Sequence, residues 1–233
     1  MNHITAIVLA AGKGSRMKSE VPKQFLELCG KPVLYYSLMT FEKSSVQDII
    51  LVTGKNDIEY CRQDIIEKYH LHKVKNVVEG GTERYWSVKN GLEAARGADY
   101  VLIHDAARPC LTQGMIESSI CEVLKIGACT VGVPVKDTIK VVDDKGYGIE
   151  TPSRNSLWQI QTPQSFAYTD IVNAYKKMEL YQDTDLTDDT MILERYLGKK
   201  TKIITGEYTN IKITTKEDLF VCENFLKKIE KSC

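Results

Sequence analysis

Short apolar runs and longer amphipathic segments alternate along the chain. The apolar runs have the length of buried strands, and they cover residues 4–10, 48–53, 75–78, 100–104, 129–135 and 201–205. Apolar residues at three- and four-residue spacing predict helices over 33–43, 57–69, 83–96, 113–125, 169–177, 187–197 and 216–228. This alternation predicts an α/β fold, with a Rossmann-like, mostly parallel sheet that has helices on both faces.

Residues 137–156 interrupt the alternation. A turn-forming DDKGYG stretch lies between the apolar segments Ile-Lys-Val-Val and Ile-Glu-Thr-Pro, and this predicts a two-stranded β-arm with Gly146 and Gly148 in its turn. An isolated hairpin is marginally stable in water, so we expect the arm to pack on something. The sequence leaves open whether it packs on its own domain or on another chain.

Length and composition limit the classes of function. A chain of 233 residues that is 43% hydrophobic suits one domain over 1–233. Lysine plus arginine equals aspartate plus glutamate at 31 each, so there is no overall positive charge to bind nucleic acid. No apolar run approaches the ~20 residues of a membrane span, and the first residues do not resemble a signal peptide. Scattered cysteines without a C-x-x-C pair fit a reducing compartment, so we expect a cytoplasmic protein.

A glycine-containing turn, LAAGKGSRM, follows the first expected strand. Gly12 and Gly14 allow backbone N–H groups to approach a ligand closely. The spacing matches neither a dinucleotide fingerprint nor a P-loop. Met17 stands where the fingerprint needs its third glycine and where a P-loop that begins at Gly12 needs its second. A plain strand-to-helix turn is therefore the alternative. The nearby cations Arg16 and Lys23 favour an anion, and we interpret the segment as a nucleoside triphosphate site.

Motifs along the whole chain are similar to those of one enzyme family. They are LAAGKGSRM with VPKQFLELCGKPVL, then GGTERYWSVKNGL, HDAARP, PVKDTIK, QTPQSF and NIKITTKEDL. In this order they resemble the sugar-phosphate and polyol-phosphate nucleotidyltransferases, and in particular the cytidylyltransferases of the 2-C-methyl-D-erythritol 4-phosphate type, from non-mevalonate isoprenoid synthesis.

The resemblance implies a set of site residues. Catalytic cations are expected at Arg16, Lys23 and Lys212, and CTP contacts at Leu9, Ala10, Ala11, Gly12, Gly14, Gly81, Thr82 and Ser87. Simpler interpretations exist for some of them. The Gly80-Gly81 pair suits an ordinary turn, Thr82 suits the N-cap of the next helix, and Lys212 suits a strand residue pointing away from Ile211 and Ile213.

HDAARP follows the strand expected at 100–104. A carboxylate at a strand end suits Mg²⁺ or another divalent cation, which binds one or two carboxylates plus phosphate oxygens, so we predict Asp105 as the metal ligand. Without the glycine turn, a carboxylate that merely stabilises a loop would be preferred. Arg108 is expected to bind the phosphate of the second substrate. His104 is expected to be a hydrogen-bonded filler without a chemical role.

The β-arm carries the remaining predicted contacts. The resemblance implies that this arm embraces a second subunit, which makes a homodimer with composite sites. On that basis Thr138 and Arg154 bind the sugar phosphate in the neighbouring chain. The alternative is a flap that folds back on its own domain.

Three further segments have structural interpretations. Trp158 and Phe166 are expected to pack, and QTPQ either lines the polyol pocket or satisfies loop backbone. The acidic stretch 183–189 resembles a metal cluster, but a helix start capped by Thr187 explains it more simply. Thr214 and Glu217 have the spacing of a capping box.

The implied reaction joins CTP to 2-C-methyl-D-erythritol 4-phosphate and releases pyrophosphate. A phosphate monoester has its second pKa near ~6, so the nucleophile is largely ionised at neutral pH and needs no general base. Alternatives are another polyol phosphate such as ribitol 5-phosphate, a uridylyltransferase, and a non-catalytic nucleotide-binding module. Lys140 in DTIK and the HDAARP and LAAG segments favour methylerythritol.

Overall fold

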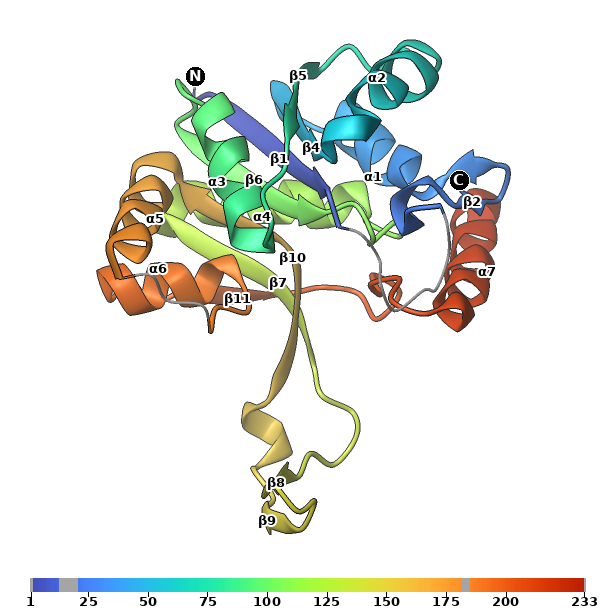
Figure 1. Ribbon diagram of the computed structural model, residues 1–233. Helices are drawn as coiled ribbons and strands as arrows, with labels where there is room; N and C mark the ends of the chain where they lie inside the picture. Colours follow the sequence, from blue (N-terminus) through green and yellow to red (C-terminus); the bar gives the residue numbers. More distant parts are fainter. Residues whose placement is uncertain (1, 13–20, 182–184, 233) are drawn as a thin grey trace.

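A seven-stranded sheet forms the centre of the molecule, with helices on both faces and an arm that projects from the body (Figure 1). The structure, a computed structural model, describes residues 2–12, 21–181 and 185–232. From one edge to the other, the strands are β11 (Lys202–Thr205), β7 (Ala128–Pro134), β10 (Trp158–Ala167), β6 (Tyr100–Asp105), β1 (Ile4–Ala10), β4 (Asp48–Thr53) and β5 (Val74–Glu79). The expected fold class is confirmed.

All neighbouring strands are parallel except at β10, which runs antiparallel to both β6 and β7. The register pairs Leu9 of β1 with Asp105 of β6, and Ala10 with Thr53 of β4. The carboxyl ends of these strands therefore meet at one edge of the sheet, which is where open α/β sheets bind ligands.

Side chains alternate along the strands between the two faces of the sheet, and each face forms its own hydrophobic core. Ala6 and Val8 belong to the core beneath α1 (Val33–Glu42), the π-helical segment η4 (Cys61–Glu67) and α4 (Gln113–Ile126). Ile7 belongs to the opposite core, beneath α3 (Arg84–Ala94), α5 (Tyr168–Tyr181) and α6 (Asp189–Leu197). Burial on both faces explains why β1 is apolar at nearly every position. Within the described residues, no helix combines the length and the apolar content needed to cross a membrane.

A third, smaller core connects the last helix, α7 (Lys216–Ser232), to the small sheet of β2 (Glu27–Leu28) and β3 (Lys31–Pro32). Ile213 is fully buried in it, and its backbone amide donates to the Ala107 carbonyl at 2.8 Å. The chain just before α7 is thereby held beside the end of β6. The predicted capping box is wrong in its partner, because Asp218 rather than Glu217 accepts from the backbone amides of Thr214 and Thr215.

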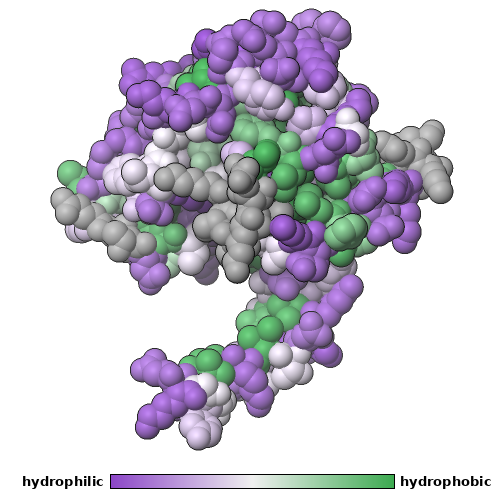
Figure 2. Space-filling view, turned by 45° about the vertical axis from the view of Figure 1, so that its right-hand side comes forward, coloured by the Kyte–Doolittle hydropathy of each residue, from purple (hydrophilic) through white to green (hydrophobic). Residues whose placement is uncertain are grey.

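The arm is a hairpin of β8 (Val141–Val142) and β9 (Gly148–Glu150), followed by the short helix η5 (Arg154–Ser156). Gly146 has a φ of +84° in the turn, whereas Gly148 begins β9. The arm extends away from the body instead of folding back on it (Figure 1). Apolar residues lie on its surface (Figure 2), among them Val142, Tyr147 and Ile149.

Strand β10 was missing from the expected elements. Its polar centre, Gln161 to Ser165, contains a proline and does not resemble a strand in sequence, yet it is buried from Gln161 to Phe166. The polar side chains are compatible with burial because three of them are hydrogen-bonded, as described below. Phe166 is fully buried in the core beneath α3 and α5, as predicted, and Trp158 is half-buried.

Candidate active site

Two cavities lie at the carboxyl edge of the sheet and share three residues, Arg84, Asp105 and Lys212. The larger cavity has a volume of about 390 Å³ and the smaller about 310 Å³. The larger one is lined by ten of the predicted residues: Leu9, Ala10, Ala11, Gly12, Lys23, Gly81, Thr82, Ser87, Asp105 and Lys212. Arg108 lines the smaller one. Gly14 and Arg16 lie outside the described residues.

The loop before α3 packs tightly on the end of β1. A Cβ added to Gly80 would lie 2.3 Å from the Cβ of Ala11, and one added to Gly81 would lie 2.2 Å from the Cβ of Trp86. Larger residues are excluded at both positions. At Gly12, by contrast, an added Cβ would meet no atom of the described residues within 4 Å.

Ser87 holds this loop from inside α3. Its Oγ accepts from the Gly81 amide at 3.0 Å and lies 3.2 Å from the Glu83 carbonyl, to which it can donate. The expected N-cap was wrong, because Glu83 is the N-cap of α3 and its side chain makes no capping bond. Thr82 is therefore not used as a cap, and it remains an exposed residue of the cavity lining.

The segment that carries Lys23 is held from two sides. Lys23 Nζ donates to the Ile213 carbonyl at 2.9 Å, and Gln24 Nε2 donates to the Ala10 carbonyl at 2.6 Å. Gln24 is buried and was not predicted. The Gln24 bond places this segment beside the end of β1, and the Lys23 bond places it beside the loop before α7. Residues of both regions line the same cavity.

Asp105 lies between two cations where the cavities meet. Its Oδ1 accepts from Arg84 Nε at 3.1 Å, and its Oδ2 accepts from Lys212 Nζ at 2.7 Å. Burial alone would raise the pKa of Asp105, but Arg84 and Lys212 outweigh burial and hold this pKa well below its usual value. The carboxylate is ionised at neutral pH. The expected strand at Lys212 is wrong, since Asn210–Ile213 has no regular structure.

Arg84 has a second carboxylate on its other side. Its two Nη atoms donate to the two oxygens of Asp189, both at 2.9 Å. Asp189 is fully buried, and the hydroxyl of Tyr175 donates to its Oδ1 at 2.6 Å. Neither Arg84 nor Asp189 was predicted. The cation in GGTER was a usable signal for Arg84, whereas Asp189 looked like part of an ordinary helix start.

The acidic stretch does begin a helix, as predicted. Its N-cap is Asp188, which accepts from the Met191 amide at 2.8 Å, so the choice of Thr187 was wrong. In the part of the chain that the structure describes, no group of three histidine, cysteine, aspartate or glutamate side chains is arranged to hold a metal ion. The helix start therefore supports the structural interpretation for residues 185–189, and residues 183 and 184 lie outside the described residues.

Arg108 is a buried cation at the smaller cavity. Its Nη1 donates to the Asn210 carbonyl at 2.7 Å, and its Nε is buried without a hydrogen-bond partner among the described residues. Burial lowers the pKa of Arg108, the charge of Asp105 partly offsets this effect, and the charge of Arg84 lowers the pKa further. A buried guanidinium whose Nε has no partner among the described residues favours an anion in the cavity.

His104, the residue before Asp105, packs in the interior and is hydrogen-bonded, as expected. It is fully buried, with Nδ1 at 2.9 Å from Thr162 Oγ1, and burial lowers its pKa to about 4. Thr162 Oγ1 also accepts from the Asp105 amide at 3.1 Å. Gln161 donates to the Glu207 carbonyl at 2.9 Å. Gln161, Thr162 and Gln164 bond to backbone groups, so that interpretation of QTPQ is confirmed; they also line the smaller cavity, and a polyol there stays a prediction.

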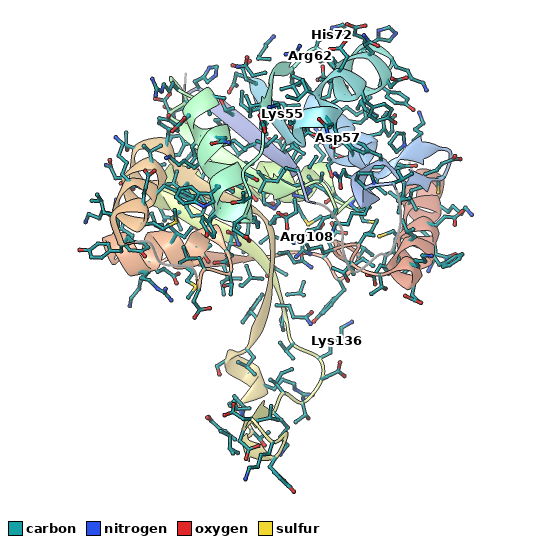
Figure 3. The ribbon with its side chains drawn as sticks, viewed as in Figure 1. Lys55, Asp57, Arg62, His72, Arg108 and Lys136 are labelled. Carbon is teal, nitrogen blue, oxygen red and sulfur yellow. The ribbon has the colours of Figure 1, made fainter. Side chains whose placement is uncertain are left out.

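The arm residues lie apart from both cavities. Thr138 and Arg154 line neither of them, and Arg154 Nη1 donates to the Lys136 carbonyl at 3.1 Å within the arm. Figure 3 shows Arg108 in the body and Lys136 where the arm begins. A single chain therefore does not bring the predicted arm contacts to the site.

A carboxylate held between two cations, at the carboxyl edge of a Rossmann-like sheet, suits the joining of two phosphate groups, which is nucleotidyltransferase chemistry. A family model described as IspD, 2-C-methyl-D-erythritol 4-phosphate cytidylyltransferase, matches residues 4–228. The chain belongs to this family.

Individual relatives agree with the family match. The chain is 50% identical to a 2-C-methyl-D-erythritol 4-phosphate cytidylyltransferase of Lachnoclostridium phytofermentans, over 98% of each chain. It is 47% identical to the enzyme of that name from Clostridium botulinum strain 657, over 98% of this chain and 100% of the other. Among solved structures, it is similar to 4-diphosphocytidyl-2C-methyl-D-erythritol synthase from Anaerococcus prevotii, with a TM-score of 0.84, 35% identity, and coverage of 97% and 96%.

Proposed function

We propose that this chain converts CTP and 2-C-methyl-D-erythritol 4-phosphate to 4-diphosphocytidyl-2-C-methyl-D-erythritol and pyrophosphate, for isoprenoid precursor biosynthesis in the cytoplasm. The observation that carries the proposal is the shared edge of the two cavities, where Asp105 lies between Arg84 and Lys212. CTP occupies the larger cavity and the polyol phosphate occupies the smaller one. Their phosphates then meet at the residues that both cavities share.

The reaction itself needs charge stabilisation more than proton transfer. An oxygen of the polyol phosphate forms a bond to the α-phosphorus of CTP, and the bond from that phosphorus to the bridging oxygen of pyrophosphate breaks. Both partners are anions, so negative charge accumulates at the five-coordinate phosphorus. Lys23 and Lys212, which line the larger cavity, stabilise it. Arg108 binds the attacking phosphate in the smaller cavity and holds it in line.

The glycine turn and the loop before α3 bind the nucleotide. Gly12 leaves the turn open to the triphosphate, and the tightly packed Gly81, with Thr82 and Ser87, forms the base pocket. Gly14 and Arg16 complete the triphosphate site in this proposal. The family resemblance supports their roles.

Asp105 fits a divalent cation such as Mg²⁺. It is ionised and lines both cavities, and each of its oxygens accepts one bond from Arg84 or Lys212, which leaves lone pairs available. One or two carboxylates plus phosphate oxygens is the usual environment of Mg²⁺. When bound, the cation neutralises charge on the triphosphate.

A second copy of the chain completes the site. The projecting arm with exposed Val142 and Ile149 supports a homodimer, since exposed apolar surface of this kind marks an interface. In the dimer, Thr138 and Arg154 bind the sugar phosphate in the partner's smaller cavity.

The test is pyrophosphate release by the purified protein with Mg²⁺, using CTP or UTP and a panel of polyol phosphates. We expect release with CTP and 2-C-methyl-D-erythritol 4-phosphate. Preference for ribitol 5-phosphate would move the assignment to another cytidylyltransferase, and nucleotide binding without turnover with any acceptor would make the chain a binding module.

Lys23→Ala tests the catalytic role of this cation. We expect turnover to fall by about 10²–10³-fold, as for the loss of one electrostatic stabiliser, while the melting temperature stays near that of the wild type. Lys125→Ala, on the surface of α4, is the matched control and should leave turnover unchanged. Near-normal turnover in Lys23→Ala would refute the assignment.

A further inference from the structure

The guanidinium of Arg84 connects a carboxylate at the cavities to one in the core. Nε faces Asp105 at 3.1 Å, while the two Nη atoms face Asp189 at 2.9 Å each. With Lys212 on the far oxygen of Asp105, the charges alternate in sign along Asp189, Arg84, Asp105 and Lys212. Asp189 makes the bidentate contact, so it holds the plane of the guanidinium more strictly than the single bond to Asp105 does.

Asp189 is built into the core and lines neither cavity. It is fully buried, and its backbone amide donates to Gln164 Oε1 on β10 at 2.9 Å. Tyr175 on α5 donates to its Oδ1 at 2.6 Å. Strand β10 and helices α5 and α6 therefore fix this carboxylate. A buried charge requires such compensation, and Asp189 receives it from Arg84 and Tyr175.

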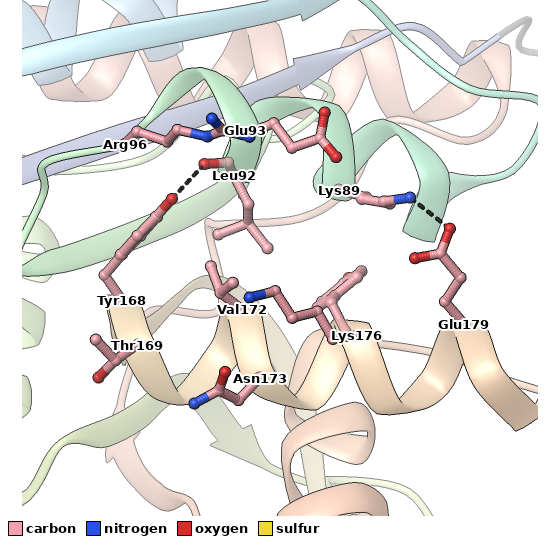
Figure 4. A pocket seen from close by; sticks show the side chains of 11 residues that line it. Lys89, Leu92, Glu93, Arg96, Tyr168, Thr169, Val172, Asn173, Lys176 and Glu179 are labelled. Carbon is pink, nitrogen blue, oxygen red and sulfur yellow. Dashed lines mark hydrogen bonds and ion pairs between the residues drawn. The ribbon is translucent and has the colours of Figure 1, made fainter.

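The helices that carry Arg84 and Tyr175 are joined on the outer side as well. Figure 4 shows a groove of about 420 Å³ between α3 and α5. Lys89 pairs with Glu179 at one end of it, and the Tyr168 hydroxyl donates to the Leu92 carbonyl at 2.9 Å at the other (Figure 4). The two helices are thus held together at both ends of the groove.

We infer that Asp189 is a positioning residue, which sets how strongly Arg84 neutralises Asp105 and so how well Asp105 binds a divalent cation. The inference deepens the proposed function and rests on it. In the native arrangement Arg84 divides its charge between two carboxylates. Without the charge of Asp189, Arg84 turns toward Asp105, and the attraction of Asp105 for a cation falls.

Asp189→Asn removes the charge and nearly preserves the shape. Partners behind a metal ligand typically contribute 10–100-fold in metal affinity or activity, so we expect a fall of about 10-fold or more in the affinity for Mn²⁺ in the presence of CTP. The measurement is electron paramagnetic resonance of free Mn²⁺. In parallel, the Mg²⁺ concentration for half-maximal turnover should rise, and added Mg²⁺ should restore part of kcat.

Asp170→Asn is the matched control, because Asp170 lies on α5 and pairs with Lys199 at the surface. It should change neither Mn²⁺ binding nor the Mg²⁺ requirement. Rescue by added metal separates positioning from general damage, since a merely structural loss would not respond to the cation.

Tyr175→Phe is the second variant in case Asp189→Asn does not fold. It removes one hydrogen bond to Asp189, and we expect a smaller shift of the Mn²⁺ affinity in the same direction. Unchanged Mn²⁺ affinity and Mg²⁺ requirement, in folded Asp189→Asn or else in Tyr175→Phe, would overturn the inference. The wild type keeps the two proposals apart, because its failure to make the product would reject the proposed function before any variant is considered.

Discussion

The cavities of the body and the projecting arm are built on opposite principles. In the body, Asp105 at the cavities and Asp189 in the core are buried, and both pair with Arg84. On the arm, apolar side chains are exposed, with Ile149 66% and Tyr147 70% accessible. Buried charge is stable only when its partners are in place, whereas exposed apolar surface is compatible with a partner that arrives later.

This difference shows which part of the molecule is complete in one chain. The described residues of the body form both cavities within one chain, and the buried carboxylates Asp105 and Asp189 find their partners there. The arm has only a short pairing of β8 with β9, and its predicted contacts, Thr138 and Arg154, lie away from the cavities of the same chain. The three predictions below test the contrast, beginning with the largest effect.

Truncation of a side chain should have different consequences in the two regions. Leu38 on α1 is fully buried, and Leu38→Ala should lower the free energy of unfolding by about 2–5 kcal/mol in urea denaturation. Ile149→Ala on the arm should lower it by less than about 0.5 kcal/mol in dilute solution. Instead it should weaken self-association in sedimentation velocity. A destabilisation by Ile149→Ala equal to that of Leu38→Ala would contradict the contrast.

Lowering the pH should reduce the stability of the body, because His104 is buried there. Burial lowers its pKa from ~6.5 in the unfolded chain to about 4, so the unfolded chain takes up this proton first as the pH falls. The associated stability is present above pH 6.5 and is lost between 6.5 and 4, with a size of about 3 kcal/mol. The pKa of Asp105 is lowered too, so its contribution is lost only below the usual carboxylate range.

The measurement is the melting temperature of the wild type and of His104→Gln from pH 7 to pH 4. The wild type should lose stability on acidification more steeply than the variant, which lacks the titrating group. Parallel curves for the two proteins would exclude His104 as the source.

Mixed dimers should give the smallest effect, and they test whether each site combines the body of one chain with the arm of the other. Lys23→Ala damages the body and Arg154→Ala damages the arm. A dimer of one chain of each kind therefore has one intact site, made of the intact body and the intact arm. Random mixing makes about half of the dimers mixed, which should restore about a quarter of wild-type turnover. Absence of recovery, with mixed dimers confirmed by differently tagged chains, would count against arm-to-partner sites.

Much of the fold was predictable because local signals agreed with one another. Each apolar run became a strand with a parallel neighbour. The inner strands β1, β4, β6 and β7 are buried on both faces and need continuous apolar sequence, whereas the edge strands β5 and β11 are largely exposed. Strand β10 could not be recognised from the sequence, because its buried centre is polar and its side chains form hydrogen bonds with groups far away in the chain. Gln164, for example, accepts from the Asp189 amide, 25 residues away.

Errors at helix starts came from choosing between adjacent oxygen-bearing residues. Thr187 was chosen where Asp188 is the N-cap, and Glu217 where Asp218 accepts the backbone bonds. Sequence places such a cap to within a residue or two, because neighbouring positions carry the same chemistry.

Local pattern and motif were enough to identify the family, the order of most strands and helices along the chain, and most residues that line the cavities. The tertiary structure alone decided which charges meet. Arg84 is 21 residues from Asp105 and 105 from Asp189, and Lys212 is 107 from Asp105. An ion pair depends on distances of a few ångströms, and these exist only after the sheet has brought its carboxyl ends together.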